Sequence, residues 1–369
     1  MSLRATPFHA RVAAANRGND WLTRNGVTLA RAYDDAHEEA LAARFRCVLV
    51  DISWRWRVML EGPHVMEFLG RLLTRDVSQL APGQALKALW LADGGGMRGA
   101  GAIARYGKES FLLVSTAPDF DWIARAASRF DVGMREISEG GLALIGPHAG
   151  AILQAAGIDF TLEPLSLRKT FWRGLDVTLS RFGEQGGYEI WRDADDGLVV
   201  WDRLMRTGAP FGLQPAGITA TDILDLEAGI ARPIRDYAPA RDGNAKTPTP
   251  KSLGLEILID ASHETFNGRA ACLAAQETKT LVGLEIDCET PAPFTPLLHN
   301  GQIAGHTLTS LYSPALRRAI ALAQIEISAS QPGTQLVLTL SPCAETPAFR
   351  NITARVTDLP FVSAPISQP

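Results

Sequence analysis

The sequence predicts a multidomain α+β protein that ends in a small antiparallel β-barrel. The chain has 369 residues, which is more than one compact core usually holds. In the first part of the chain, hairpin, helix and strand patterns follow one another twice, which suggests two α+β halves. From about Lys279 the pattern changes to short strands separated by turn signals, which is typical of a small barrel.

Composition excludes several classes of protein. The net charge is −4 with both signs dispersed and no basic tract, which argues against a nucleic-acid partner. No apolar run reaches membrane-spanning length, and the first twenty residues lack the apolar core of a secretory signal. We therefore expect a cytoplasmic protein without a membrane partner. The four cysteines are scattered and predict reduced thiols rather than disulfides: Cys47, Cys272, Cys288 and Cys343.

The first elements are a helix and a pair of strands. Residues 1–32 are expected to form a mobile arm followed by a first ordered segment. A helix is predicted over 33–45, because its acidic residues come early and its basic residues late, as the helix dipole favours. Segment 47–62 predicts two strands, since an apolar run precedes an alternation of Trp and Arg. If that alternation is a strand, Trp54 and Trp56 lie on one face.

Helix and strand patterns then follow one another up to the middle of the chain. Helices are recognised by apolar residues at helical spacing, and strands by short apolar runs next to turn residues. In chain order we expect a helix at 63–77, a strand near 88–92, strands at 102–106 and 111–115, a helix at 117–130, and a strand at 141–147 followed by a helix.

The stretch 181–237 combines glycine turns, a strand and two helices with several acids. Glycines at 183, 186 and 187 let the backbone bend before Tyr188, which starts a predicted strand. Helices are expected at 198–208 and 219–229, and the second carries Asp222 and Glu227. Glu189 lies on the strand, where a carboxylate rarely stays unless it is paired. Such acids can hold an amine or amidine through paired hydrogen bonds.

The last part of the chain contains a polar loop, one helix and the barrel. Segment 238–252 is rich in Pro, Lys and Thr and predicts a long functional loop, and a helix is expected over 266–276. The barrel strands are predicted at 280–286, 296–310, 319–327, 335–340 and 352–362.

Two motif types in the sequence have simpler explanations than a cofactor or metal site. Gly94, Gly96 and Gly99 satisfy G-x-G-x-x-G, and Asp119 follows at about the spacing of a dinucleotide site. The next segment is too short for the required helix and leads into a strand, so a tight hairpin or a ligand-side loop is favoured. The seven histidines show no metal-binding spacing, and no nucleophile motif occurs, so we expect no metal site.

The sequence pattern alone leaves the roles of three further residues open. Trp54 and Trp56 could be core residues or an aromatic wall. Arg98 could reach into a cavity from the glycine loop, or be a solvated turn residue. Pattern and composition therefore lead no further than a multidomain α+β protein with an acid-lined pocket.

Several separate segments read as motifs of one kind of protein, in the same order. They are FLGRLLTRDVSQLAPGQA, GGYEIW, GLQPAGITATDILDLEAGIARPIRDY and GQIAGHTLTSLYSPALRRAIALAQI. The first resembles the run FLxRLLTNDVxxLxPGQA, and together the segments resemble the glycine-cleavage T-protein (aminomethyltransferase) family of folate-dependent one-carbon enzymes. The resemblance covers most of the chain. It implies a three-domain cloverleaf, with two interleaved α+β sub-domains in a folate-binding catalytic region (1–278) and a barrel at 279–369.

The resemblance also implies tetrahydrofolate as the cofactor, in a central channel. The residue that matches the family's pterin-binding carboxylate is Glu189. The 2-amino and N3–H edge of a pterin presents two donors, which a carboxylate accepts side by side. The other cofactor contacts that we expect are Tyr188, Thr116, Asp222 and Glu227.

Departures from the family pattern bear on the reaction. The family has an Asp pair after its Gly-Gly, where this chain has Gly99 and Ala100. Two family arginines are replaced by Thr221 and Asp225, and a family histidine is replaced by Trp54. These changes argue against a carrier-borne aminomethyl substrate, so we expect no carrier protein as partner.

The departures look more like the demethylase relatives, which move a methyl group from a methoxyaromatic or sulfonium compound to tetrahydrofolate. We expect Tyr33 and Arg98 to stabilise the leaving oxyanion and Trp54 to stack on an aromatic substrate, with Trp56 and Tyr237 as further substrate contacts. Three alternatives stay open. They are a lyase that releases or transfers a formaldehyde-level carbon from an aromatic substrate, a true aminomethyltransferase, and a non-catalytic folate-binding protein. The oligomeric state is also open.

Overall fold

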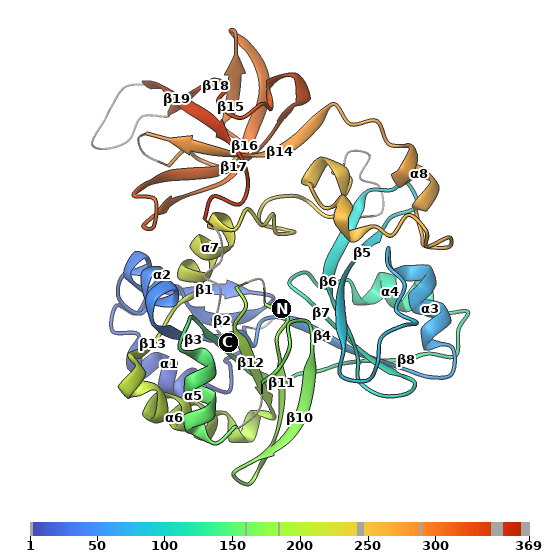
Figure 1. Ribbon diagram of the computed structural model, residues 1–369, viewed down its shortest axis with the longest axis vertical. Helices are drawn as coiled ribbons and strands as arrows, with labels where there is room; N and C mark the ends of the chain where they lie inside the picture. Colours follow the sequence, from blue (N-terminus) through green and yellow to red (C-terminus); the bar gives the residue numbers. More distant parts are fainter. Residues whose placement is uncertain are drawn as a thin grey trace. The chain divides into compact units, whose positions relative to one another are not determined.

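The computed structural model describes residues 3–158, 161–183, 185–241, 247–287, 290–340 and 350–362. The chain divides into two compact units (Figure 1). The first unit is built on Met1–Leu89 and Gly99–Asp222, and the second on Trp90–Arg98 and Ile223–Ser363.

The N-terminal segment of the first unit is ordered rather than a mobile arm. It forms α1 (His9–Ala15) and the hairpin of β1 (Trp21–Arg24) and β2 (Val27–Ala30). Phe8 is only 1% exposed because its ring is buried in the core of the unit. The expectation of a mobile arm was therefore wrong, because the apolar residues of this short helix anchor it.

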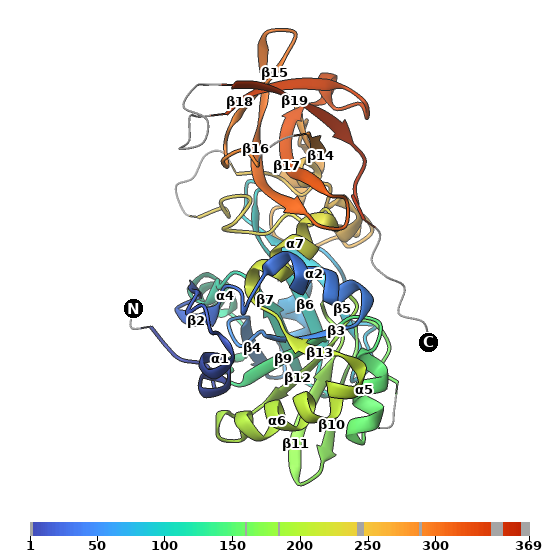
Figure 2. The same cartoon turned by 90° about the vertical axis from the view of Figure 1, so that its left-hand side faces the viewer.

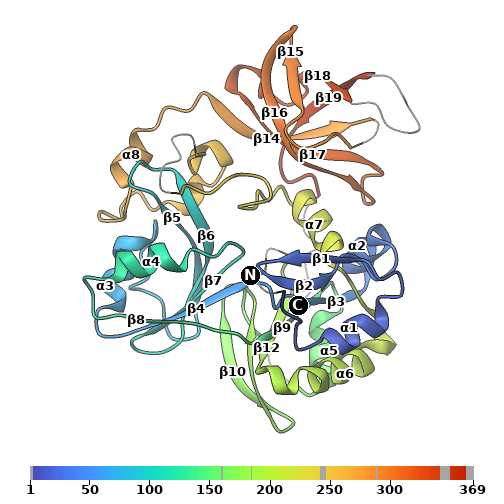
Figure 3. The ribbon, with the colours of Figure 1, turned by 180° about the vertical axis from the view of Figure 1, so that it is seen from behind.

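A six-stranded sheet forms one half of the first unit. Its order is β10-β11-β12-β9-β3-β13, and all neighbours are antiparallel except β3 and β13. The strands are β3 (Cys47–Asp51), β9 (Gly140–Ile145), β10 (Leu167–Trp172), β11 (Leu175–Ser180), β12 (Tyr188–Arg192) and β13 (Leu213–Pro215). Helices α1, α5 (Ala149–Ala156) and α6 (Gly197–Gly208) lie beside this sheet (Figure 3). Their apolar side chains form one core with those of β3, β9, β11 and β12.

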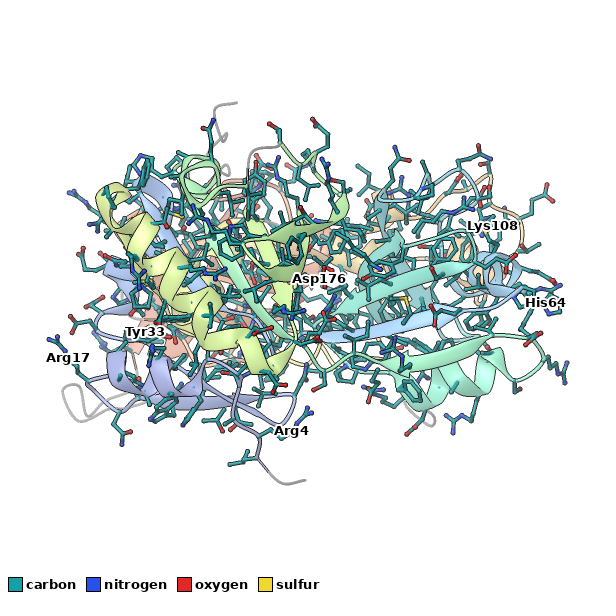
Figure 4. The ribbon with its side chains drawn as sticks, turned by 90° about the horizontal axis from the view of Figure 1, so that it is seen from below. Arg4, Arg17, Tyr33, His64, Lys108 and Asp176 are labelled. Atoms are coloured by element: carbon teal, nitrogen blue, oxygen red, sulfur yellow. The ribbon has the colours of Figure 1, made fainter. Side chains whose placement is uncertain are left out.

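A five-stranded antiparallel sheet has the order β5-β6-β7-β4-β8. Its elements are β4 (Trp56–Glu61), α3 (Val65–Leu72), β5 (Ala85–Leu91), β6 (Met97–Arg105), β7 (Ser110–Ser115), α4 (Phe120–Ala127) and β8 (Gly133–Glu136). His64, just before α3, and Lys108, in the β6–β7 turn, lie at the end of the first unit opposite Tyr33 (Figure 4). Tyr33 precedes α2 (Ala36–Phe45) and is buried in the core beside the six-stranded sheet.

The second unit contains a closed barrel of order β14-β17-β16-β15-β18-β19 (Figure 2). Its strands are β14 (Lys279–Ile286), β15 (Pro296–His299), β16 (Gln302–Ser313), β17 (Arg318–Glu326), β18 (Gln335–Leu340) and β19 (Arg350–Thr357). The β15–β16 turn uses Asn300 and Gly301, both with positive φ, as a tight hairpin requires. Helix α7 (Ile218–Glu227) begins in the first unit and ends in the second. Helix α8 (Arg269–Ala274) belongs to the second unit.

The predicted α+β class and the C-terminal antiparallel barrel are confirmed, and β14 begins at Lys279, where the sequence pattern changes. The expected division of the chain at 278/279 stays a prediction. The helix expected over 266–276 is shorter, because Gly268 takes a positive φ of 73° before α8 begins. The hairpin of β10 and β11 was not predicted from the sequence. Within the loop 238–252, residues 242–246 lie outside the described residues.

Cys47 and Cys272 are free thiols, and Cys288 and Cys343 lie outside the described residues. Among the residues that the structure describes, no helix combines the length and the apolar character needed to cross a bilayer. In the same residues no group of three or more His, Cys, Asp and Glu side chains could hold a metal ion.

Candidate functional site

Glu189 lies in the middle of the six-stranded sheet and is 1% exposed. Its strand β12 pairs with β11 and β9, which places Ser180 directly opposite Glu189. Ser180 Oγ donates a hydrogen bond of 2.7 Å to Glu189 Oε2, and Arg55 Nη1 donates one to Oε1. The prediction that this carboxylate needs a partner is therefore confirmed, and the partner is Arg55.

A buried network extends from this carboxylate. Trp191 Nε1 donates to Ser180 Oγ at 3.2 Å, so the same hydroxyl links the indole to Glu189. The guanidinium of Arg57 lies over the Trp191 ring, with Cζ 4.1 Å from the ring centroid, and forms an ion pair with Glu139. Charge-assisted bonds and the cation–π contact hold these side chains in one arrangement.

The glycine turn before β12 packs closely against β9 and against the carboxylate of Glu189. Gly186 has φ of 69°, and a Cβ at Gly187 would lie 2.3 Å from the carbonyl oxygen of Leu144. A Cβ at Gly183 would lie 3.4 Å from Glu189 Oε1, so the backbone of this turn passes close to the carboxylate. The predicted glycine turn is confirmed, and its absent side chains bear directly on the candidate site.

The tip of the β1–β2 hairpin brings three predicted residues together. Asn25 Nδ2 donates to the backbone oxygens of Trp54 at 2.9 Å and Thr116 at 3.0 Å. Arg24 forms an ion pair with Asp222, and its Cζ lies 5.1 Å from the centroid of the Trp54 ring. The hairpin tip therefore joins Trp54, Thr116 and Asp222 through Arg24 and Asn25.

Trp54 lies in the turn between β3 and β4 and is not part of a strand. The expected alternation of Trp54 and Trp56 along one strand was therefore wrong. Trp54 packs on Val27, Leu29 and Ile218, and its buried Nε1 has no hydrogen-bond partner among the described residues. A buried donor without a partner is unusual in proteins, so a ligand acceptor at this position would satisfy it.

Trp56 begins β4 and is 7% exposed. Its Nε1 donates to Glu136 Oε1 at 2.5 Å, so its one polar atom is already used within the sheet. Tyr188, at the start of β12, is half-buried beneath the guanidinium of Arg181, which lies 4.9 Å from the ring centroid. The ligand contacts expected of Trp56 and Tyr188 stay predictions.

Tyr33 is buried in the core of the first unit. Burial, together with the nearby carboxylates of Asp51 and Glu39, raises the pKa of the Tyr33 hydroxyl. The phenol therefore keeps its proton and acts as a hydrogen-bond donor rather than a base. Asp51, at the end of β3, accepts bonds from Ser53 N at 3.0 Å and Ser53 Oγ at 2.6 Å and so fixes the turn that follows the strand.

Three predicted residues belong to the second unit. Arg98 lies on β6 and is 4% exposed, so it is not a solvated turn residue. Glu227 is fully buried and accepts a bond of 2.5 Å from Ser313 Oγ on the barrel strand β16. Tyr237 is buried, its hydroxyl has no hydrogen-bond partner among the described residues, and burial beside Asp236 raises its pKa. Their ligand contacts stay predictions.

The glycine cluster at 94–99 is a packed hairpin turn between β5 and β6. Gly95 has φ of 78°, and a Cβ there would lie 2.7 Å from the backbone nitrogen of Cys272. A Cβ at Gly96 would lie 2.0 Å from Oγ1 of Thr247. The turn leads into strand β6 and not into a helix, so the dinucleotide interpretation is excluded and the hairpin interpretation is confirmed.

Sequence reasoning missed Arg55, Arg24 and Asn25. The signal for Arg55 was present, because a buried strand carboxylate requires a cation and the segment W-R-W-R supplies two. The contacts of the β1–β2 hairpin carried no comparable signal, since they join residues far apart in the sequence.

Comparisons with known proteins define the class of this protein. The family model described as GCVT N-terminal domain matches residues 9–261, and the one described as glycine cleavage T-protein C-terminal barrel domain matches residues 279–363. The chain therefore belongs to the glycine-cleavage T-protein family, as the sequence motifs predicted.

Individual relatives agree with this family. The chain is 29% identical over 352 residues to an aminomethyltransferase of Halothermothrix orenii, covering 92% of this chain and 94% of that protein. It is 31% identical over 348 residues to an aminomethyltransferase of Bacillus pumilus, covering 90% and 93%. The crystal structure of the glycine cleavage system aminomethyltransferase T from Bartonella henselae has the same fold, with a TM-score of 0.86, 24% identity and 98% of each chain covered. Aminomethyltransferases of this family use tetrahydrofolate, which confirms the cofactor expected from the sequence.

Proposed function

We propose that this protein is a tetrahydrofolate-dependent one-carbon transferase that demethylates a small methoxyaromatic compound or a related methyl donor. Demethylation rather than aminomethyl transfer is supported by Arg98, a buried cation on β6. The two residues that follow it, Gly99 and Ala100, stand where the family pattern has two acids. A buried cation favours an anionic group on the substrate or the leaving group, whereas an acid favours an amine. The expected cytoplasmic location and the small aromatic substrate are part of this proposal.

The residues around Glu189 fit a pterin ring. Each oxygen of Glu189 accepts one bond from the protein, which leaves lone pairs on both for a pair of ligand donors. Gly183 carries no side chain beside Oε1, so a ligand ring meets only backbone on this side of the carboxylate. Tetrahydrofolate supplies the nucleophilic nitrogen, N5, that accepts the one-carbon unit.

The protein's own task is to orient the ligands and to stabilise the leaving group. Glu189 fixes the orientation of the pterin through a pair of bonds on a buried strand. Trp54 offers a ring face and an Nε1 donor that has no hydrogen-bond partner among the described residues. A methoxyaromatic leaves as a phenoxide, and the hydroxyl of Tyr33, which stays protonated, is proposed to stabilise that charge.

Aminomethyl transfer is the second candidate, because the curated relatives carry that name. The products distinguish the two reactions. Demethylation yields 5-methyltetrahydrofolate and a phenol, whereas aminomethyl transfer yields 5,10-methylenetetrahydrofolate and ammonia.

The test is to incubate the purified protein with tetrahydrofolate and a panel of methoxybenzoates, and separately with an aminomethylated carrier protein. Mass spectrometry of the folate and aromatic products then identifies the reaction. Formation of 5-methyltetrahydrofolate together with a hydroxybenzoate supports the proposal. Formation of 5,10-methylenetetrahydrofolate from the carrier alone overturns it, and free formaldehyde from an aromatic substrate identifies a lyase instead.

A further inference from the structure

Arg55 is the one cation bound to the proposed pterin carboxylate among the described residues, and its contacts go beyond a simple ion pair. Its Nη1 donates to Glu189 Oε1, and Glu189 is the only hydrogen-bond partner of its side chain within the part of the chain that the structure describes. The Nε atom of Arg55 is buried and has no hydrogen-bond partner among the residues that the structure describes. Glu189 keeps only 2% of its side chain exposed, whereas Arg55 keeps 18%. The guanidinium therefore has unused donors beside the carboxylate.

We propose that Arg55 is a specificity-determining residue that joins Glu189 in reading the edge of the pterin ring. This inference rests on the proposed use of tetrahydrofolate. The edge presents an acceptor, the oxygen at position 4, next to two donors, the N3–H and the 2-amino group. Arg55 and Glu189 present the complementary order, with guanidinium donors next to two carboxylate acceptors.

The energetics favour retention of the ion pair when a ligand binds. Removing the cation from a carboxylate that is almost fully buried leaves an uncompensated charge, which is strongly unfavourable. A neutral pterin edge donates hydrogen bonds but cannot supply that charge. Arg55 therefore stays on Oε1, and its remaining donors meet whatever group lies next to N3 on the ligand.

Because Arg55 keeps its free donors beside N3, the protein should distinguish ligands by the group at position 4 of the pterin ring. A 4-oxo ligand offers an acceptor to Arg55, whereas a 4-amino ligand offers a donor and, when its ring is protonated, a positive charge. The wild-type protein should therefore prefer folic acid to aminopterin, which differs from folic acid only by a 4-amino group in place of the 4-oxo group.

The experiment is calorimetric titration of the full chain and of Arg55→Met with folic acid and with aminopterin. Wild type should prefer folic acid, and Arg55→Met should bind folic acid about tenfold more weakly and lose or invert the preference. Arg55→Lys keeps a charge on Glu189 and should retain part of the preference, so it serves if Arg55→Met does not fold.

The matched control is Arg192→Met, which removes an arginine paired to a carboxylate, Asp196, at the other end of strand β12 and outside the network around Glu189. It should lower the melting temperature without changing the ratio of the two affinities. An unchanged ratio in Arg55→Met, or tighter binding of folic acid, overturns the inference. Absence of binding of either pteridine and of tetrahydrofolate to wild type overturns the proposed function as well, so the two failures are distinguishable.

Discussion

Two glutamates of the first unit are equally buried but satisfied in different ways. Glu39, on α2, is 2% exposed, and Glu189, on β12, is 1% exposed. Glu39 accepts three backbone N–H groups, from Tyr33 at 2.7 Å and Asp34 at 3.2 Å on Oε1 and from Gly217 at 2.7 Å on Oε2. Glu189 accepts one side-chain hydroxyl and one guanidinium.

The difference separates a structural acid from an acid available to a ligand. Glu39 ties the segment before α2 to the turn at Gly217, and backbone groups that depend on it have no other way to be satisfied without water. Glu189 is held by side chains and keeps lone pairs, with Gly183 beside it. Burial alone therefore does not identify a binding carboxylate, whereas the nature of its partners does.

The largest expected effect is on the structural acid. Glu39→Ala should lower the free energy of unfolding by about 4 kcal/mol, because three backbone donors lose their acceptor and each costs about 1–3 kcal/mol. Urea unfolding followed by circular dichroism measures this loss. If the protein is natively folded under the assay conditions, its affinity for tetrahydrofolate should be unchanged. A change of less than about 1 kcal/mol would contradict the structural role.

The next effect concerns the ligand acid. Glu189→Gln should weaken tetrahydrofolate binding about 100-fold, near 3 kcal/mol, because an amide offers one acceptor where the carboxylate offers two, and it loses the charge. Calorimetric titration measures the affinity, and Glu39→Gln serves as the matched control with wild-type affinity. Unchanged affinity in Glu189→Gln would remove Glu189 from the proposed site.

A third prediction concerns the pH dependence that the structural acid Glu39 gives to stability. Burial raises the pKa of Glu39 above its ordinary value of 4.5, so the folded protein holds this proton more tightly than the unfolded chain. The corresponding stability is fully present below about pH 4.5 and is lost as the pH rises through the folded pKa. Burial raises the pKa of the Asp51 carboxyl as well.

The measurement is the free energy of unfolding from pH 4 to pH 7 for wild type and Glu39→Gln. The variant should lose the part of the pH dependence that comes from Glu39 and keep the part from Asp51. Identical slopes in the two proteins would show that Glu39 has the same pKa in the folded and unfolded states.

The fold could be predicted further from the sequence than the site. Helical spacing, glycine turns and the change of pattern at Lys279 are local signals, so the two α+β halves and the barrel followed from them. The need of Glu189 for a partner was also predictable, because a carboxylate on a buried strand requires one. Which arginine pairs with Glu189 depends on the register between β3, β9 and β12. It therefore depends on contacts between residues that are distant in sequence.

Two errors have the same physical origin. Trp54 was expected on a strand from its alternation with Arg55, but the chain turns between β3 and β4 and the ring packs under the β1–β2 hairpin. The N-terminal arm was expected to be mobile because short segments carry weak local signals, yet Phe8 is buried by tertiary packing. In both places, long-range contacts decide the local structure.

The smallest expected effect concerns Ser180, the second hydrogen-bond partner of Glu189. Ser180→Ala removes the hydroxyl that donates to Glu189 Oε2 and accepts from Trp191 Nε1. We expect tetrahydrofolate binding to weaken about fivefold, near 1 kcal/mol, since one neutral donor to the carboxylate is lost while the Arg55 ion pair stays. Calorimetric titration measures the change, with Ser53→Ala as the control, because Ser53 donates in the same way to the structural acid Asp51. An effect as large as that of Glu189→Gln would mean that Ser180, rather than Arg55, holds the carboxylate in its binding orientation.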